Sequence, residues 1–448
     1  MLNSQNLINK ICDRINAGGL SSLESCQANN ALNILSNSVV SVASFANLPN
    51  AITYAGRLVY VNDENRYYHA VDGNWLNNLN SKLFNYRPEV YSWGFATTGR
   101  LGDNTVVSKS SPVLVAGGFT DWNQVSAGGI HVIGIRCGGV AWAWGQGTSG
   151  ELGDCSVVTK SSPVSVVGGF TDWCQVSGGG NHSLGVRCNG TAWAWGGNTF
   201  GTLGDNTTVN KSSPVSVVGG FTDWCQLSAG GSHSLGVRQN GTAWGWGCNT
   251  GGQLGDNTIV SKISPVSVVG GFTDWLQVSA GRTHSLGVRQ NGTAWAWGCN
   301  ACGILGDNTA VSKSSPVSVV GGFTDWSQVS AGNAHSIGLR SNGSLWSWGC
   351  NIDGQLGDNT NVSRSSPVSV VGGFTDWCQV ATGCSHSIAV RQNGTAWAWG
   401  QNNFGSLGDN TVTVRSSPVS VVGGLSGWCQ VSAGIVFSTA VSQSKKGF

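Results

Sequence analysis

The 448-residue chain is poor in charged side chains, which make up 10% of it, and it contains one methionine. Its 23 Lys and Arg nearly balance its 21 Asp and Glu, so the net charge is +2. Proteins that bind nucleic acid or acidic membranes through charge need dense basic patches. Lys445 and Lys446 are the one basic pair in the sequence, and we therefore expect no nucleic-acid partner.

Long apolar runs are missing as well. No run approaches the roughly 18 residues that a membrane-spanning helix needs, and residues 1–19 are polar and charged where a secretory signal has an apolar centre. We expect neither membrane insertion nor a secretory signal. Proline is scarce too, and seven of the nine prolines recur at a fixed distance from one another.

That distance is 51 residues, and it defines a sequence repeat. The tripeptide Leu-Gly-Asp and a tryptophan follow the same spacing as the proline. Seven copies fill residues 85–441 without an insertion or deletion. The tripeptide begins at Leu101, Leu152, Leu203, Leu254, Leu305, Leu356 and Leu407, and the tryptophans are Trp122, Trp173, Trp224, Trp275, Trp326, Trp377 and Trp428.

Each copy contains four short runs that are typical of β-strands, which we call A to D. In the second copy they are Pro163–Val167, Trp173–Ser177, His182–Arg187 and Thr191–Trp195, with Gly, Asn and Asp between them. Repeated four-stranded sheets predict an all-β, seven-bladed propeller. A β-solenoid and a string of independent modules are the alternatives.

The two ends of the array support closure into a ring. The array begins with a D-type run, Val90–Gly94, and ends after a C-type run, Phe437–Val441. The last blade therefore lacks the strand that the start of the array provides. Pairing these strands would close the ring and remove two free sheet edges, which favours a propeller over a solenoid.

The repeat also carries a family resemblance. It reads Trp-Gly-x-Asn-x-x-Gly-x-Leu-Gly-Asp-Asn-Thr, then Lys-Ser-Ser-Pro-Val, Gln-Val-Ser-Ala-Gly, His-Ser and Asn-Gly-Thr-Ala-Trp-Ala-Trp-Gly. This unit resembles the regulator of chromosome condensation (RCC1) repeat over about four fifths of the chain. The resemblance implies a seven-bladed propeller. It implies function less directly, because the fold serves exchange factors, protein inhibitors and other binding proteins.

Residues that recur in every copy are interpreted as scaffold. Most charges occupy four repeat positions, represented by Asp103, Lys109, Asp121 and Arg136, although a ring of Asp or Lys that binds an ion or polyanion is the alternative. Six histidines share one position and Phe437 takes the seventh, which indicates packing and not catalysis, since catalysis needs one nucleophile and one base. The histidines are His131, His182, His233, His284, His335 and His386. We therefore expect no catalytic residues and no enzymatic activity.

Cysteine usage predicts mostly free thiols. Equivalent positions in neighbouring blades come within disulfide distance only near the ring centre. Cys299 and Cys302 form a lone C-x-x-C without a second pair, which is a weak zinc signal. We expect no metal site and no cofactor.

Binding residues are sought where the copies differ. The B–C and D–A loops vary, the A–B loops and C–D turns hardly do, and in an antiparallel blade the two variable sets emerge at the same end. We call this end the variable face and expect it to bind partners, unless its differences are neutral drift. Its aromatic and charged members, of the kind found at interaction hot spots, are Arg100, Glu151, Phe200, Arg282, Asp353 and Phe404.

The first 84 residues lie outside the repeat. Residues 6–17 place Leu7, Ile8, Ile11 and Ile15 on one helical face, and a second helix after Ser21 carries Leu32 and Leu35. Two such short helices cannot bury a core alone, so these six residues are expected to anchor the chain or make it oligomerise. The expected divisions are a helical hairpin and linker (1–50), a β-hairpin module with strands 57–61 and 66–71 (51–84), the propeller (85–441) and a tail (442–448).

Residues 45–75 loosely resemble hairpin modules of tailed-phage fibres and appendages. Combined with an anchor and a ring, this resemblance predicts a non-enzymatic virion protein, attached through residues 1–84 to other virion proteins or to itself, and displaying the propeller to a host receptor or glycan. The expected location is the virion, with the cytoplasm as alternative. The competing functions are an RCC1-type nucleotide-exchange or chromatin-binding propeller and a soluble inhibitor propeller.

Overall fold

The computed structural model describes residues 39–42, 58–61, 66–71, 74–76, 86–425 and 427–445. The chain divides into two compact units, one formed by Met1–Arg87 with Gln443–Phe448 and the other by Pro88–Ser442. The two expected helices, with Leu7, Ile8, Ile11, Ile15, Leu32 and Leu35, lie outside the described residues. The expected division of the first 84 residues and their anchoring role stay predictions.

The first unit contains one described sheet, with the strand order β1-β2-β3-β4. Its strands are β1 (Val39–Val42), β2 (Leu58–Val61), β3 (Arg66–Val71) and β4 (Asn74–Leu76). Strand β1 is parallel to β2, and β2 is antiparallel to β3 with Leu58 opposite His69. The paired strands β2 and β3 confirm the expected hairpin.

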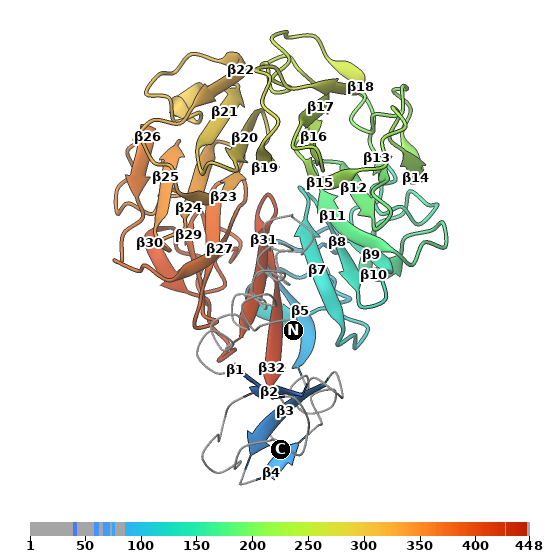
Figure 1. Cartoon of the computed structure of the whole chain (residues 1–448), viewed down its shortest axis with the longest axis vertical. Helices are drawn as coiled ribbons and strands as arrows, with labels where there is room; N and C mark the ends of the chain where they lie inside the picture. Colours follow the sequence, from blue (N-terminus) through green and yellow to red (C-terminus); the bar gives the residue numbers. More distant parts are fainter. Residues whose placement is uncertain are drawn as a thin grey trace. The chain divides into compact units, whose positions relative to one another are not determined.

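The second unit is a seven-bladed β-propeller, as predicted (Figure 1). Each blade runs from an innermost B strand through C and D to the A strand of the following repeat. The B strands are β7 (Trp122–Ala127), β11 (Trp173–Gly178), β15 (Trp224–Ala229), β19 (Trp275–Ala280), β23 (Trp326–Ala331), β27 (Trp377–Thr382) and β31 (Trp428–Ala433). The C strands are β8 (His131–Arg136), β12 (His182–Arg187), β16 (His233–Arg238), β20 (His284–Arg289), β24 (His335–Arg340), β28 (His386–Arg391) and β32 (Phe437–Lys445).

The D and A strands form the outer half of each blade. The D strands are β5 (Tyr86–Gly94), β9 (Ala141–Gly145), β13 (Ala192–Gly196), β17 (Ala243–Gly247), β21 (Ala294–Gly298), β25 (Leu345–Gly349) and β29 (Ala396–Gly400). The outermost A strands are β6 (Lys109–Leu114), β10 (Lys160–Ser165), β14 (Lys211–Ser216), β18 (Lys262–Ser267), β22 (Lys313–Ser318), β26 (Arg364–Ser369) and β30 (Arg415–Ser420). One short 3-10 helix, η3 (Ala301–Gly303), lies in a D–A loop.

The closing blade combines both ends of the array, in the order β31-β32-β5-β6. Strand β5 thus lies in the place that the last repeat leaves unfilled. Two further hydrogen bonds reinforce the seam: Ser92 Oγ donates to Thr439 Oγ1 at 3.1 Å, and the backbone N–H of Phe95 donates to the Val436 carbonyl at 3.0 Å. This arrangement confirms the closure that the ends of the array predicted.

Tryptophan packing between blades forms the core. In one cluster, Leu184 and Val186 of β12 pack with Trp224 of the next blade's innermost strand and with Trp246 of its D strand. Trp224 and Trp246 are both nearly inaccessible to solvent, and five further boundaries repeat the design with equivalent residues. Large aromatic side chains at fixed positions therefore fill the wedges between blades.

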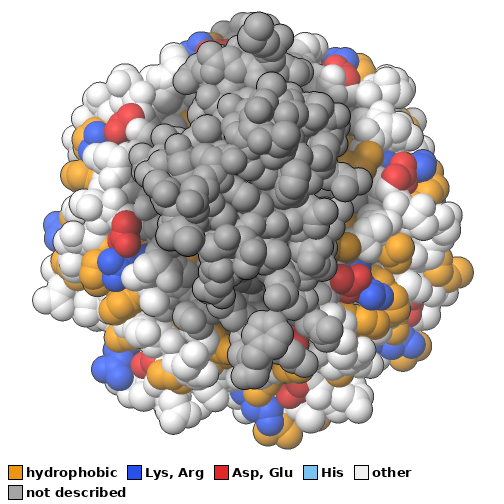
Figure 2. Space-filling model, turned by 60° about the horizontal axis from the view of Figure 1, so that its bottom comes forward, with side chains coloured by type: hydrophobic (Ala, Val, Ile, Leu, Met, Phe, Trp, Pro, Cys, Tyr) orange, Lys and Arg blue, Asp and Glu red, His pale blue; other side chains and the backbone are white. Residues whose placement is uncertain are grey.

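The recurring charges pair locally. Arg136 binds Asp121 with 2.7 Å between Nε and Oδ1, and its guanidinium lies 4.0 Å from the centre of the Phe119 ring. The outer strands carry a second series, such as Arg364 with Asp358 at 3.3 Å. Figure 2 shows positive and negative side chains beside one another around the described periphery. These pairs support the scaffold interpretation and leave few charges for recognition.

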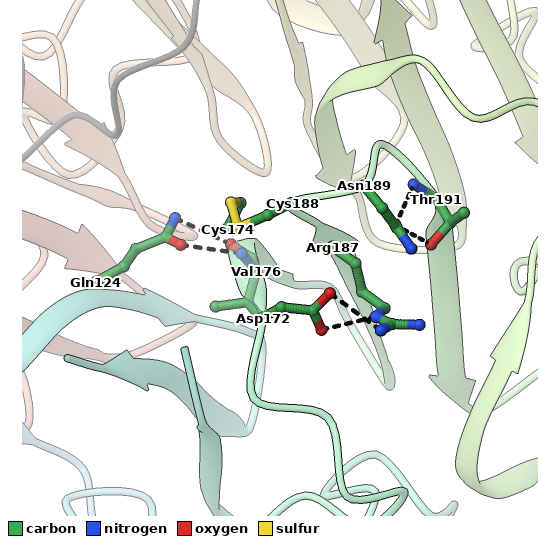
Figure 3. The surroundings of a disulfide bond; sticks show 8 residues. All are labelled: Gln124, Asp172, Cys174, Val176, Arg187, Cys188, Asn189 and Thr191. Carbon is green, nitrogen blue, oxygen red and sulfur yellow. Dashed lines mark hydrogen bonds and ion pairs between the residues drawn. A yellow bond between two sulfur atoms is a disulfide. The ribbon is translucent and has the colours of Figure 1, made fainter. Parts of the chain in front are cut away.

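The described residues include two disulfides that the comparison of equivalent positions did not predict. Cys174 of β11 bonds Cys188, the residue that follows the end of β12, with a Cα–Cα distance of 5.1 Å (Figure 3). Cys302 joins Cys350 in the D–A loop of the next blade, also at 5.1 Å. Both bridges link non-equivalent repeat positions, which is why considering only equivalent ones missed them.

Substitution of Trp93 tests how much the closure of the ring contributes to stability. Trp93 lies in the first strand of the array and donates its indole N–H to the Ser406 carbonyl, near the end of the array, at 2.9 Å. We expect Trp93→Ala to lower the free energy of unfolding by about 3–5 kcal/mol, as for other buried aromatic truncations. Trp93→Phe keeps most of the volume and loses the donor, so about 1–3 kcal/mol is expected. Denaturant unfolding measures both. A Trp93→Ala loss no larger than that of the exposed Val107→Ala would contradict this closure.

Candidate functional site

The B–C and D–A loops meet at one end of the propeller. The first residue of each D–A loop donates its N–H to a carbonyl in the B–C loop of the same blade, as Gln146 does to Ile130 at 3.0 Å and Gly197 to Asn181 at 2.7 Å. The expected variable face therefore exists as a continuous surface of paired loops.

A belt of glutamines fixes the innermost strands beneath this face. The Gln124 amide accepts from the Val176 N–H at 2.9 Å and donates to the Val176 carbonyl at 3.2 Å, so it imitates a strand pair between two blades (Figure 3). The same link occurs at every boundary, and Gln430 closes it by accepting from the Val125 N–H at 2.8 Å. Each blade's inner strand is thereby held in register with its neighbour.

The six histidines join blades directly below the B–C loops. His284 Nε2 lies 2.9 Å from Ser336 Oγ in the next blade, and Ser336 Oγ donates to the Ile304 carbonyl at 2.8 Å. Trp348 donates to the same carbonyl at 2.9 Å. The other five histidines repeat this arrangement with distances of 2.8–3.0 Å to serine. The set is structural, as the sequence analysis expected.

At the seventh boundary, between the closing blade and the blade of β7 to β10, both the histidine and the serine are replaced. Phe437 occupies the histidine position of the closing blade, and Val132 occupies the matching serine position of the blade that follows it around the ring. Both are completely buried. An apolar pair thus substitutes for a hydrogen-bonded one, which avoids leaving a buried hydroxyl or imidazole without a partner.

Burial holds the histidines neutral. It lowers the pKa of His284 to about 3 and that of His386 to about 4, and burial together with the nearby Arg100 cation lowers the pKa of His131 to about 3. Groups with such low pKa values do not act as bases near neutral pH on a hydroxyl that already bonds a carbonyl. This chemistry supports a scaffold role.

Buried asparagines organise the D–A loops, a role that the repeat pattern Trp-Gly-x-Asn did not by itself indicate. Asn198 Nδ2 donates to Asp205 Oδ1 at 3.0 Å, and Asn198 Oδ1 accepts from the Leu203 N–H at 3.0 Å. Equivalent residues are Asn249, Asn300, Asn351 and Asn402. Their recurrence every 51 residues was a usable signal. Because these loops are internally bonded, only their tips are free to present different side chains.

Two of the six predicted binding residues are buried, which corrects their assignment to an exposed surface. Arg100 is 5% exposed and lies 5.1 Å from the Phe95 ring centre, and burial lowers its pKa to about 10. Glu151 is inaccessible, and desolvation raises its pKa. Both occupy the position whose carbonyl accepts from the tryptophan of the next blade, so the fold turns their side chains inward.

The other four predicted residues lie at the surface of the loops. Phe200 is 44% exposed and Phe404 is 43% exposed, while Arg282 is exposed and Asp353 half-buried. The structure adds Ile352, which is 74% exposed beside Asp353, and Ile435, which is 42% exposed. The Phe404 ring packs against the Phe95 ring at a tilt of 48°, with 4.5 Å between ring centres. The variable face therefore carries exposed apolar side chains and charged side chains at separate positions. Their role in binding stays a prediction.

A cavity of about 390 Å³ opens at the centre, where the seven B–C loops converge. We call it the hub cavity. Its wall contains a ring of interblade hydrogen bonds, such as Gly180 N–H to the Gly230 carbonyl at 2.9 Å. One repeat position of this ring varies between blades, and it is occupied by Gly129, Gly180, Gly231, Arg282, Asn333, Cys384 and Ile435.

The described residues offer no clustered ligands for a metal: no group of three or more His, Cys, Asp or Glu is found among them. Within the same residues, no helix has the length and apolar character needed to cross a bilayer. The chemistry that the face supports is contact with another molecule through exposed apolar and charged side chains.

Comparisons with known proteins agree with the fold. The model of the RCC1-like domain matches residues 218–448, and the model of the regulator of chromosome condensation repeat matches residues 89–135, 138–186 and 189–237. The ultraviolet-B receptor UVR8 of Arabidopsis thaliana is 29% identical over 73% of this chain and 76% of its own length. The human E3 ubiquitin-protein ligase HERC2 is 28% identical over 75% of this chain, which spans 7% of that ligase.

Solved structures show the same architecture. Prp20p of Saccharomyces cerevisiae, whose binding to Gsp1p and histones its structure report describes, superposes with a TM-score of 0.72 at 21% identity, covering 81% of this chain and 93% of that one. Human WBSCR16 has a TM-score of 0.72 at 20% identity, covering 80% and 99%. At these identities the likeness shows the fold.

The virion prediction is wrong. The relatives that match over most of the propeller are RCC1-type proteins of plants, animals and yeast, and no comparison supports the loose likeness of residues 45–75 to phage fibres. Attachment to virion proteins, display to a host receptor and a virion location are therefore withdrawn. A short hairpin is common to many folds and carried too little information to identify one class of protein.

The buried histidines make stability depend on pH. In the unfolded chain they take up protons near pH 6.5, whereas in the fold their pKa values are about 3 to 4. The unfolded state thus binds more protons in this interval, so the free energy of unfolding is full above about pH 6.5 and falls as the pH drops toward 4. Denaturant unfolding at pH 7.5, 6 and 5 measures this, and equal stability at pH 7.5 and 5 would refute it.

A double-mutant cycle tests the histidine–serine link. Ser336→Val leaves His284 Nε2 without its partner and should cost about 1–3 kcal/mol. The double variant His284→Phe with Ser336→Val copies the Phe437 and Val132 combination. We expect it to be more stable than the sum of the single losses by about 1 kcal/mol or more, with a weaker dependence on pH. Additive losses would show that the pair is not coupled.

Proposed function

The chain belongs to the RCC1-like domain family, and we propose that it is a non-enzymatic regulatory propeller that binds a protein partner through its variable face. The observation that carries this proposal is the contrast between the two ends of the ring. One end repeats nearly the same loops in most blades, whereas the other presents different side chains on loops that are rigidly bonded beneath their tips.

The exposed members of the variable face have the chemistry of protein recognition. Phe200, Ile352 and Phe404 present apolar surface, and Asp353 and Arg282 add charges of both signs. Aromatic residues and arginine dominate binding energy at protein interfaces. A protein partner also agrees with the reports on the fold neighbour Prp20p, which describe its binding to Gsp1p and histones and its complex with Kap60. The ligase activity of HERC2 is not proposed, because this chain spans 7% of that protein.

Capture of partners by the full chain tests the proposal. We expect Phe200→Ser combined with Ile352→Ser to reduce recovery of a specific partner about tenfold, the effect of losing one or two hot-spot residues. Gln290→Ser is the matched control, because Gln290 is exposed in a C–D turn at the opposite end. Quantitative mass spectrometry of proteins bound from cells that express the chain measures recovery. Equal loss with the control, or no loss with the double variant, would contradict the assignment of the face.

Nucleotide exchange is the more specific form that the RCC1 resemblance implies. The assay is release of labelled GDP from purified small GTPases in the presence of the full chain. Faster release that the double variant abolishes would identify the partner class, while unchanged release together with face-dependent capture would leave a binding regulator without exchange activity.

A further inference from the structure

The hub cavity breaks the symmetry of the propeller. Every B–C loop contains a glycine at the position of Gly128. At the next position, three consecutive blades carry Gly129, Gly180 and Gly231, and the other four blades carry larger residues. A Cβ on Gly180 would collide with the Gly231 carbonyl, so the close approach of the neighbouring loop requires glycine at this position. The other half presents Arg282, Asn333, Cys384 and Ile435.

The larger residues form a polar arc on one side of the cavity. Arg282 Nη1 donates to Asn333 Oδ1 at 3.4 Å, and Asn333 Nδ2 donates to Cys384 Sγ at 2.9 Å. Ile435 is 42% exposed and provides an apolar contact next to Gly129, whose Cβ would lie 3.1 Å from Ile435 Cδ1. The wall therefore combines a bare backbone half with an arc of a cation, an amide, a thiol and an aliphatic side chain.

Charge decides which ligand fits. Arg282 is the one charged residue among the described residues that line the cavity, and within that part of the chain no acidic group lies within ion-pair distance of it. The repeated arginines are different, because each binds its own aspartate, as Arg289 does to Asp274 at 2.8 Å. Arg282 thus offers donors to an anion, and a planar guanidinium suits a carboxylate in particular.

We infer that the hub cavity binds an acidic side chain of a protein partner, with Arg282 as its anion-binding residue. The volume of about 390 Å³ fits a short peptide segment and is too small for a folded element. The inference rests on the proposed protein-binding function and names the chemistry of one subsite on the same face. A nucleic-acid phosphate is the competing ligand, and the near-neutral charge of the chain disfavours it.

Peptide titration of the full chain tests the inference. The probes are an acetylated and amidated octapeptide of alternating Ser and Glu, and its counterpart with Gln in place of Glu. We expect the Glu peptide to bind and Arg282→Gln to weaken it about fivefold, the loss of one exposed ion pair. Lys109→Gln is the matched control, since it removes the same charge from the outermost strand β6. Equal weakening by both substitutions, or equal binding of the Gln peptide, would overturn the inference.

Cys384 reports where the peptide binds. It lines the cavity and is a thiol, whereas Cys137 is an exposed thiol in a C–D turn at the other end. We expect the Glu peptide to slow iodoacetamide labelling of Cys384 at least threefold and to leave Cys137 unchanged. Protection of both or neither would place the peptide elsewhere and overturn the inference. Arg282-dependent protection by an eight-residue thymidine oligonucleotide, stronger than that by the peptide, would overturn it in favour of a phosphate ligand.

The outcomes separate this inference from the proposed function. If Phe200→Ser with Ile352→Ser abolishes partner capture while Arg282→Gln leaves the Glu peptide bound, the acidic subsite is refuted and the binding face stands. If the Glu peptide binds through Arg282 while the double variant still captures its partner, the subsite stands and the proposed face fails.

Discussion

Hydrogen bonds that cross from each blade to the next are the constraint on which this propeller depends. Gln124 and its equivalents hold the innermost strands together, and the chain of histidine, serine and loop carbonyl holds the next layer. The glutamine links and the histidine–serine links join groups 52 residues apart in sequence, except at the closing boundary, where Gln430 bonds Val125 across 305 residues. An insertion within one of these strands would move its remaining residues out of register with the neighbouring blade, whereas an insertion at a loop tip would leave these bonds in place.

This constraint separates positions that can vary from positions that cannot. The buried asparagine of a D–A loop bonds the loop to itself, and the carbonyl of the residue before Leu-Gly-Asp receives the next blade's tryptophan. Side chains at that residue are free to differ, yet they point inward, as Arg100 and Glu151 show. Variation reaches the surface at the loop tips and at the hub, where it produces a few distinct points on an otherwise repetitive ring.

The sequence predicted the fold well because the fold is periodic. The spacing of Leu-Gly-Asp, the Asn-Gly turns and the complementary ends of the array determine the number of blades and the closing strand. The site was harder to predict for a physical reason. Variation between copies marks Arg100 and Phe200 alike, and burial, which separates them, depends on contacts between repeats. The Cys302–Cys350 bridge and the match of Phe437 with Val132 also join different repeats, and comparison of equivalent positions does not show them.

Because the closing blade combines strands from both ends of the array, the ring can close only after its last strand has been synthesised. Strand β5 is among the first parts of the propeller to leave the ribosome, and its neighbour β32 is the last strand to appear. Until then, β5 can pair with β6 alone, and the inner edge of the first complete blade has no neighbour on its closing side. The nascent ring is therefore an open arc with an unpaired edge on β5 until β32 has been made, and molecules that protect such edges can act during that interval.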